Sequence, residues 1–479
     1  VVTSPAAGVR RRPPSLTTCA SMLLFLALVS QAQERTVTWY SAPIHLRPSE
    51  VHNKMDKPTQ LPPALSRDFS NSSIAVRSFT VDVVALDGRN GEERSVPLHE
   101  AYNHHYVSFI GSKQGILELF NYTSKSDFDP LGGGCEKPPP NQLLSMRTHK
   151  AHRAGFTQFG GASGAEFRHN PHAFPEPYSY IIHSPESAIV LLHLINQQPL
   201  LGEDGSSAGK RPSPWFECPC TPQREFDLAA GTIDGCLPRP RFECTDALIA
   251  QQNSGCSLAH YTGGYRCCEH GNFLTDTSKQ DVRDGPISTY MLKFTLTFRQ
   301  HLPARDRALH PTACCDVTEG MRDEGSGTRF GGNVEYDIPQ CAKGTSPERC
   351  LHIATNVRPI DWTGPGDKHD PHEMIELVHA VGHLHVGGTQ IDLVDELTGQ
   401  LICRSIAQYG SGLEAGDEVG YLVGIDPCVW GPPPLPPPPR FKRSHPVRTI
   451  AYYNSTQAHT GVMSLWLMSA AVVESAPAA

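Results

Sequence analysis

Short runs of alternating apolar and polar residues indicate that this chain is a β protein. In the clearest run, Tyr290–Phe298 (YMLKFTLTF), the apolar residues Leu292, Phe294, Leu296 and Phe298 alternate with polar ones. A period of two is typical of a strand with one buried face. Shorter runs of strand type are Phe79–Leu86, Tyr106–Ile110 and Ile189–Ile195. No segment longer than about 12 residues shows a clean helical period, so we expect an all-β fold.

The length of the chain predicts more than one domain. Its 479 residues exceed what one hydrophobic core usually fills. We expect an N-terminal domain at residues 76–300 and a C-terminal domain at residues 301–475, preceded by a polar leader at residues 33–75. The Pro-rich run at residues 431–439 predicts an exposed polyproline II loop in the second domain. A net charge of -8 argues against a nucleic-acid partner.

The first 32 residues have the make-up of a secretory signal peptide. Arg10, Arg11 and Arg12 precede the apolar run Met22–Val29, and small residues follow up to Ala32. A membrane anchor is the alternative, but spanning a bilayer takes about 20 apolar residues. We therefore expect secretion without a stable membrane span. Met22 is a candidate translation start.

Glycosylation sequons and cysteines agree with an extracellular location, in a cell wall or a similar compartment. Sequons stand at Asn71, Asn121 and Asn454. Of the 15 cysteines, 14 remain if the signal peptide is removed, which allows up to seven disulfides. Seven of them lie within residues 205–285, which we interpret as a disulfide-stapled insertion into the first domain. A zinc cluster at its Cys-x-Cys and Cys-Cys pairs is the alternative, which secretion disfavours.

Two histidine pairs are candidate metal ligands. His104 and His105 are adjacent, and adjacent strand residues point to opposite faces, so both reach one ion only where the strand is bulged or twisted. His383 and His385 are two apart and share a strand face. A competing interpretation pairs His379 with His383 on a helix, as in zinc sites. It is disfavoured because no Glu follows His379 and Gly382 would lie inside the helix.

Further candidates are a methionine and four histidines in loops. Met463 follows His459 closely, and a thioether favours Cu(I), although a core role for Met463 is the simpler interpretation. The loop histidines flank Asn-Pro and Asp-Pro, and we interpret them as solvated surface residues, with a labile metal site as the alternative. They are His169, His172, His369 and His372.

Several long motifs resemble the stress up-regulated Nod 19 family of secreted proteins. The longest are the segments His383–Gly424 and Asn454–Met463. Asn333–Cys341 and the cysteine motifs at 218–220 and 263–268 also fit. The resemblance covers residues 75–472.

That family in turn resembles, more distantly, the type II ascorbate-dependent copper monooxygenases that act on peptidylglycine and dopamine. The shared order is an early His-His, a single His late in the first domain, a His-x-His in the second domain and then a Met. The resemblance implies two tandem antiparallel jelly-roll-like β-sandwiches and two copper ions. The implied ligands are His104, His105 and His193 for one ion and His383, His385 and Met463 for the other. Without the resemblance, His193 would be an ordinary core residue.

The resemblance also implies a reaction, in which the three-His copper passes an electron and the other copper reacts with dioxygen to hydroxylate a C–H bond, with ascorbate as reductant. Where the peptide-acting enzymes carry Arg, Asn and Tyr near their substrate, this chain has Val381, Leu465 and Leu467. The substrate, a small molecule or a peptide, is therefore open. Two alternatives to an enzyme remain, a metal-binding or cell-wall-associated stress glycoprotein and a purely structural extracellular protein.

Overall fold

The computed structural model describes thirteen ranges of the chain, and the account below concerns those residues. They are 33–48, 50–86, 92–123, 155–159, 165–170, 172–198, 271–274, 286–312, 317, 336–338, 340–361, 370–457 and 459–473. The predicted signal peptide and residues 201–270, which form most of the predicted Cys-rich insertion, lie outside the described residues.

The strands up to residue 300, here called the first half, build two sheets, and the strands after it form the second half. One contains β1 (Arg35–Tyr40), β13 (Ser288–Gln300), β5 (Ser73–Leu86) and β10 (Tyr178–His183), with β2 (Ile44–Leu46), β6 (Glu93–Ser95) and β9 (His172–Ala173) paired to them. The other runs in the order β12 (Gly271–Leu274), β3 (Glu50–Met55), β11 (Ser187–Asn196), β7 (Ala101–Gly111) and β8 (Phe156–Phe159), with β4 (Thr59–Gln60) on β11. The helices of this half are α2 (Pro63–Ser66), α3 (Lys113–Thr123) and the 3-10 helix η1 (Ala165–Arg168).

The second half also builds two large sheets. One contains β14 (Arg307–Thr312), β25 (Ser464–Val472), β17 (Met374–Leu384), β21 (Cys428–Val429) and β22 (Arg440–Lys442). The other runs in the order β16 (Leu351–Pro359), β23 (Pro446–Asn454), β18 (Gly388–Asp395), β19 (Leu401–Tyr409) and β20 (Leu422–Ile425). A small sheet pairs β15 (Tyr336–Ile338) with β24 (His459–Val462), and the 3-10 helix η4 (Pro347–Arg349) precedes β16.

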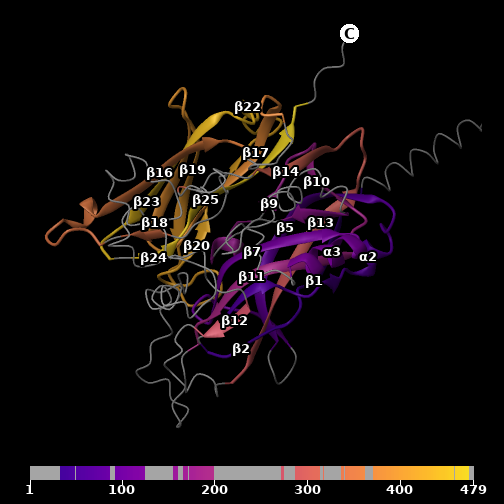
Figure 1. Cartoon of the computed structure of the whole chain (residues 1–479), viewed down its shortest axis with the longest axis horizontal. Coiled ribbons are helices and arrows are strands. Elements are labelled where there is room, and N and C mark those ends of the chain that lie inside the picture. Colours follow the sequence, from indigo (N-terminus) through magenta and orange to yellow (C-terminus); the bar gives the residue numbers. More distant parts are fainter. Residues whose placement is uncertain are drawn as a thin grey trace, which may run out of the picture.

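The two halves share one continuous sheet. β10 pairs in parallel with β14, so the strand order runs β1-β13-β5-β10-β14-β25-β17-β21 across both halves. Figure 1 shows the first half, mostly indigo to magenta, beside the orange to yellow second half. Apart from β10 and β14, the pairs between the named strands are antiparallel. The all-β prediction is confirmed, and the jelly-roll connectivity stays a prediction.

The side chains on both faces of strand β11 are buried, and one of these faces carries His193. Val190, Leu192 and Leu194 point into the core of the first half. The alternate residues Ile189 and Leu191 belong to a second apolar cluster on the opposite face. That cluster includes Ile116 and Leu119 of α3 and also contacts Leu467 of β25. The outer face of β11 is therefore turned toward the second half, and His193 lies on that face by the same alternation.

Some boundaries differ from the sequence-based expectations. Residues 33–75, interpreted as a leader, contribute β1 to β4 and α2 to the first half, so its strands begin at Arg35. The strand β1 has only two buried or nearly buried apolar side chains among polar ones, so its period is weak. The Pro-rich run lies at the surface, with most of its residues exposed. The apolar run near the C-terminus forms the buried strand β25.

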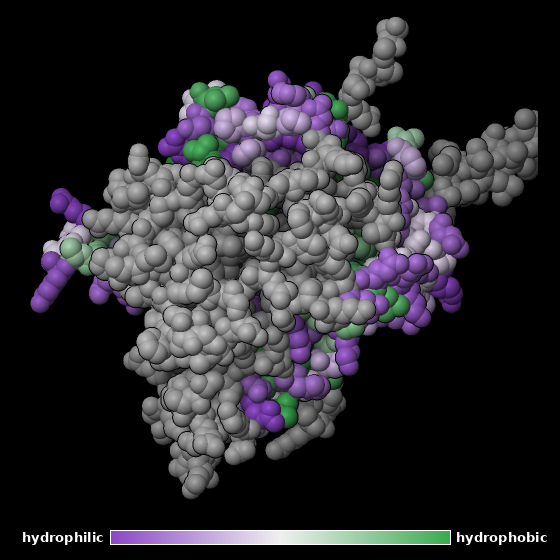
Figure 2. Space-filling model, viewed as in Figure 1, coloured by the Kyte–Doolittle hydropathy of each residue, from purple (hydrophilic) through white to green (hydrophobic). Residues whose placement is uncertain are grey.

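The described part of the surface is mostly polar on the face that Figure 2 shows, with apolar residues in small separate patches. Two disulfides lie among the described residues, Cys341–Cys350 and Cys403–Cys428. The second joins β19 to β21 and so connects the two large sheets of the second half. No helix among the described residues is long and apolar enough to cross a membrane.

Candidate metal centre

A β-bulge in β7 brings its two histidines to one place. His105 pairs with His193 of β11, but the next residue of β11, Leu194, pairs with Asn103. His104 is therefore the extra residue of the bulge. In a regular strand the two rings would point to opposite faces. The bulge removes this alternation, so that His104 and His105 lie on the same side as His193.

These three histidines form a compact group, here called the three-His group. One ring nitrogen from each of His104, His105 and His193 can be chosen so that all three atoms lie within 4.8 Å of one another. Nδ1 of His193 is 3.3 Å from Nε2 of His105. All three side chains are buried. The structure thus brings together the three residues predicted as one ligand set, while metal binding by them stays a prediction.

The second pair lies at the end of β17. His383 is the penultimate residue of this strand, and His385 follows its end. The strand conformation of 374–384 rules out the helical pairing of His379 with His383. Gly382 allows β17 to lie close to the opposite sheet, since a Cβ there would be 2.2 Å from Cγ2 of Ile391.

The two pairs meet in one cluster. The ring centroid of His104 lies 4.4 Å from that of His193 and 4.5 Å from that of His385. The rings of His383 and His385 are 5.1 Å apart. We call these residues the five-His cluster: His104, His105, His193, His383 and His385. Three come from the first half and two from the second, so the cluster lies where the halves meet.

Burial keeps His104 and His385 in a state suited to metal ligation. Loss of water around His104 lowers its pKa well below the usual value, and the neighbouring imidazoles, first that of His193, lower it further. Burial lowers the pKa of His385 in the same way, with His383 as the nearest contributor. The neutral imidazole is the form that binds metals.

Several ring nitrogens of the cluster have no hydrogen-bond partner among the described residues. They are both nitrogens of His104, both of His385 and Nε2 of His383. A buried polar atom without a partner costs about 1–3 kcal/mol of stability, so such atoms usually have a partner in the working state. Imidazole nitrogens that converge in this way fit a transition-metal ion, for which they are common ligands.

Hydrogen bonds to the Tyr453 hydroxyl connect the backbone of His385 with the backbone of Met463. The backbone N–H of His385 donates to the Tyr453 hydroxyl over 3.2 Å, and that hydroxyl donates to the carbonyl of Met463 over 2.9 Å. Ser464 Oγ is a further partner of the hydroxyl at 3.2 Å. The side chain of Met463 is buried. Ligation by its sulfur stays a prediction.

Sequence reasoning did not assign Glu166 or His459 to the site. Glu166, on η1, places Oε1 2.8 Å from Nδ1 of His383, and both side chains are buried. His459 on β24 packs against Gly387, and a Cβ on Gly387 would be 2.3 Å from its Nε2. Glu166 belongs to no motif, and only the fold brings it to His383. His459 carried a signal, since it lies four residues before Met463.

The loop histidines differ from the expectation in one case. His169 and His372 are exposed, as expected, and His369 lies outside the described residues. His172 is buried, however, so its interpretation as a surface residue was wrong. Its ring stacks on Phe79 with centroids 4.3 Å apart and lies 5.4 Å from the ring of His379. Strand β9 pairs with β5 and carries the ring into the core.

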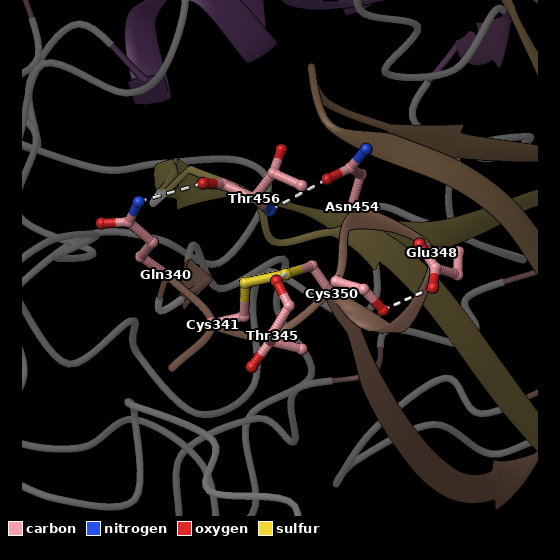
Figure 3. Close-up of a disulfide and its surroundings, with 8 residues drawn as sticks. Gln340, Cys341, Thr345, Glu348, Cys350, Asn454 and Thr456 are labelled. Carbon is pink, nitrogen blue, oxygen red and sulfur yellow. Dashed lines mark hydrogen bonds between the residues drawn. A yellow bond between two sulfur atoms is a disulfide. The ribbon is translucent and has the colours of Figure 1, made fainter. Parts of the chain in front are cut away.

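A disulfide holds the segment that leads to His459. Cys341 and Cys350 are bonded, and Cys341 N–H donates to the carbonyl of Ser455, while Ser455 N–H donates to the carbonyl of Cys350. Figure 3 shows this disulfide beside Asn454 and Thr456, with the Gln340 amide donating to the Thr456 carbonyl over 3.0 Å. The disulfide loop thus fixes the chain just before β24.

The three apolar residues that the resemblance to the copper monooxygenases placed near a substrate, Val381, Leu465 and Leu467, serve packing in this structure. Val381 is buried in the core of the second half. Leu465 pairs with His383 between β25 and β17 and is also buried. Leu467 contacts the outer apolar cluster of the first half. None of the three side chains carries a group that binds a peptide carboxylate.

Comparisons with known proteins identify a family over part of the chain. Residues 241–473 match the family model described as "Stress up-regulated Nod 19", which confirms the resemblance to that family. No curated protein matches the chain.

Among solved structures, the chain is similar to the structure of infectious bursal disease virus strain Gt, at 9% sequence identity and a TM-score of 0.09. The match covers 92% of this chain and 81% of the viral chain. The VP2 subviral particle of the same virus gives 8% identity, 92% and 81% coverage, and a TM-score of 0.10. At these scores the likeness carries no inference about fold or function.

Proposed function

Since residues 241–473 match the model of the stress up-regulated Nod 19 family, we propose that this chain is a secreted, stress-related glycoprotein that binds copper at the five-His cluster. The observation that carries the proposal is the state of His104 and His385. Both rings are buried, both have lowered pKa values because of burial, and their four nitrogens have no hydrogen-bond partner among the described residues.

The donor set fits copper. Imidazole suits Cu(II) and Cu(I), and a thioether such as that of Met463 favours Cu(I). The three-His group would hold one ion, and His383, His385 and Met463 would hold a second. Bound copper would supply a one-electron couple at this position. The chain's own contribution is to hold neutral rings in fixed orientations, through the bulge in β7 and the Tyr453 hydroxyl.

Secretion and glycosylation are part of the same proposal. Disulfides such as Cys341–Cys350 and Cys403–Cys428 persist in oxidising compartments. The sequon residues Asn71, Asn121 and Asn454 are exposed, as an acceptor asparagine has to be. Together with the predicted signal peptide, these features support an extracellular location.

Metal content of the secreted protein tests the proposal. Elemental analysis of the copper-loaded wild type is expected to give two copper ions per chain. His383→Ala is expected to lose one ion, and Met463→Leu to keep it with a weaker affinity for Cu(I). His372→Ala, at an exposed histidine outside the cluster, is the matched control and should bind as the wild type does. A wild type that takes up no copper after loading contradicts the proposal.

A second candidate function is an ascorbate-dependent monooxygenase with an unknown substrate. It is favoured by the order of the six predicted ligands, five of which the structure gathers in one cluster. The apolar side chains at Val381, Leu465 and Leu467 disfavour a peptide carboxylate as the group recognised. Oxygen uptake by the copper-loaded protein with ascorbate and a broad substrate panel tests this candidate. Absence of substrate-dependent uptake by a protein that binds copper would leave the non-catalytic binding function.

A further inference from the structure

The carboxylate of Glu166, in the first half of the chain, lies beside a histidine of the second half. Its Oε1 lies 2.8 Å from Nδ1 of His383. An ionised carboxylate only accepts hydrogen bonds, so the His383 ring donates through Nδ1–H. The nitrogen left without a hydrogen is then Nε2, which has no hydrogen-bond partner among the described residues. This is the nitrogen that a metal would use.

The helix η1 that carries Glu166 is fixed firmly to the first half. Two residues further on, Arg168 donates to Asp82 over 2.6 Å and to the carbonyl of Val96 over 2.6 Å. These two partners lie on and just after strands of the first half. Charge-assisted bonds of this kind at a partly buried side chain hold a short segment in one position.

The same segment is bonded to the second half. His169 Nε2 is 2.6 Å from the carbonyl of Gly416, and the side-chain oxygen of Asn170 accepts the N–H of Ile425 over 3.2 Å. Residues 165–170 thus connect the two halves. Glu166 belongs to this connecting segment, and its side chain is fully buried.

A fully buried carboxylate needs a compensating charge or hydrogen bonds. Among the described residues, His383 is the hydrogen-bond partner of Oε1 of Glu166, and the second oxygen, Oε2, has no hydrogen-bond partner. The neighbouring Arg168 side chain donates instead to Asp82, to the Val96 carbonyl and to Glu418. A cation held by the neighbouring imidazoles would compensate this charge, which gives the carboxylate a role beyond packing.

From these contacts we infer that Glu166 is a positioning residue for copper binding: it holds the His383 ring with Nε2 turned to the metal. The inference rests on the proposed copper-binding function. It means that binding at the His383–His385 pair depends on a residue of the other half. Partners of this kind on ligand histidines are typically worth about 10–100-fold in metal affinity.

Three variants of the full-length secreted protein test the role. Glu166→Leu removes the acceptor, while Glu166→Gln keeps an oxygen that can accept from Nδ1–H. Glu418→Gln is the matched control, because Glu418 is equally buried at the same interface and is bonded to Leu98 N–H and Arg168 rather than to a cluster histidine. Affinity for Cu(I) is measured by competition with a chromophoric chelator, and the Cu(II) sites by electron paramagnetic resonance.

Glu166→Leu is expected to weaken binding of one ion by about 10–100-fold and to change the spectrum of that ion, with a smaller loss in Glu166→Gln. Glu418→Gln is expected to keep wild-type affinity even if its unfolding temperature falls. Wild-type affinity and spectrum in Glu166→Leu would overturn the inference. So would an equal loss of affinity in Glu418→Gln, because that result would show a general effect of the interface.

A measurement without metal separates this inference from the proposed function. In copper-free protein with ¹⁵N-labelled histidine, the nuclear magnetic resonance signal that disappears in His383→Ala is expected to show the hydrogen on Nδ1. Glu166→Leu is expected to shift this signal toward the Nε2–H form. A hydrogen found on Nε2 in the wild type contradicts the inference whether or not the protein binds copper. Failure of the wild type to bind copper contradicts the proposed function instead.

Discussion

At the scale of single residues, the turn after β17 fixes His385. Gly387 has φ +94°, a conformation that favours glycine. Its N–H donates to the Tyr409 hydroxyl over 2.9 Å, and that hydroxyl donates to the carbonyl of Gly388 over 2.8 Å. The ring of His459 lies directly against the Cα of Gly387. The Gly-Gly pair after His-x-His therefore allows a tight turn and the close approach of β24.

Gly387→Ala is expected to destabilise the protein and to weaken copper binding. The positive φ costs about 1–3 kcal/mol, and a Cβ at 2.3 Å from His459 Nε2 would displace that ring beside His385. Gly344→Ala is the control, because Gly344 has φ +92° and nothing within 4 Å of the added Cβ. Urea unfolding and copper affinity are measured for both. If Gly344→Ala weakens copper binding as much as Gly387→Ala does, contact with His459 is not the cause.

His104 illustrates a conflict between stability and function at one position. It is the extra residue of a bulge, its ring is buried, and neither ring nitrogen has a hydrogen-bond partner among the described residues. Each of these features lowers stability in the absence of a ligand. Natural chains break local rules of this kind mainly at functional sites, which supports a metal as the missing partner.

At the scale of elements, the buried histidines of strands β9 and β17 predict a pH dependence. Burial lowers the pKa of His172 to about 3, with a further contribution from His379, and burial lowers the pKa of His379 to about 4. Both histidines have a pKa of about 6.5 in the unfolded chain. The unfolded chain therefore takes up protons that the folded chain does not, and stability falls as the pH drops below about 6.5.

For each of these two histidines, the expected loss of stability between pH 7 and pH 5 is about 2 kcal/mol. His172→Phe keeps the ring stacked on Phe79 but cannot titrate, so it should lose less stability than wild type over this range. The measurement is the urea midpoint of copper-free protein at both pH values. His372→Gln, at an exposed histidine, should keep the wild-type difference. An equal pH dependence in His172→Phe and wild type would show that His172 becomes protonated without unfolding.

The disulfide between β19 and β21 is expected to stabilise the second half. Cys403 and Cys428 close a loop of 25 residues between two sheets, and closing such a loop is worth about 3 kcal/mol. Replacing both cysteines by serine should lower the free energy of unfolding by that amount, measured with urea. The double replacement at Cys341 and Cys350, which are 9 apart in sequence, should cost less stability. Unchanged stability in the first variant would mean that the sheets are held by packing alone.

Individual elements were more predictable than the site. The alternation in Tyr290–Phe298 identified β13, whose even-numbered apolar residues are all buried, and the spacing of His383 and His385 indicated a shared strand face. The bulge at His104 depends on the register between β7 and β11, which a single strand sequence does not contain. The helix η1 is four residues long, too short to show a period, so Glu166 gave no signal.

At the scale of the whole molecule, the site lies where the two halves meet, and this apposition was not predictable from local patterns. Hydrogen bonds cross the boundary at several points. Tyr178 donates to Glu376 over 2.6 Å, Arg307 donates to the Tyr178 hydroxyl over 3.2 Å, and the hydroxyls of Tyr180 and Ser469 are 2.8 Å apart. The continuous sheet through β10 and β14 adds backbone bonds. The cluster histidines from the two halves are therefore held in a fixed relation.

Copper bound between the halves is expected to stabilise the whole chain against unfolding. Because unfolding separates the ligands of each ion, free copper at 100 times the dissociation constant should add about 2.7 kcal/mol for each ion bound. This appears as a higher temperature of unfolding in calorimetry. His193→Ala in the first half and His385→Ala in the second half should each reduce the increase, while the exposed His372→Ala should keep it. If copper raises the unfolding temperature equally in all of these variants, it binds outside the five-His cluster. If only one of the two cluster variants reduces the increase, copper binds only in the half that carries that histidine.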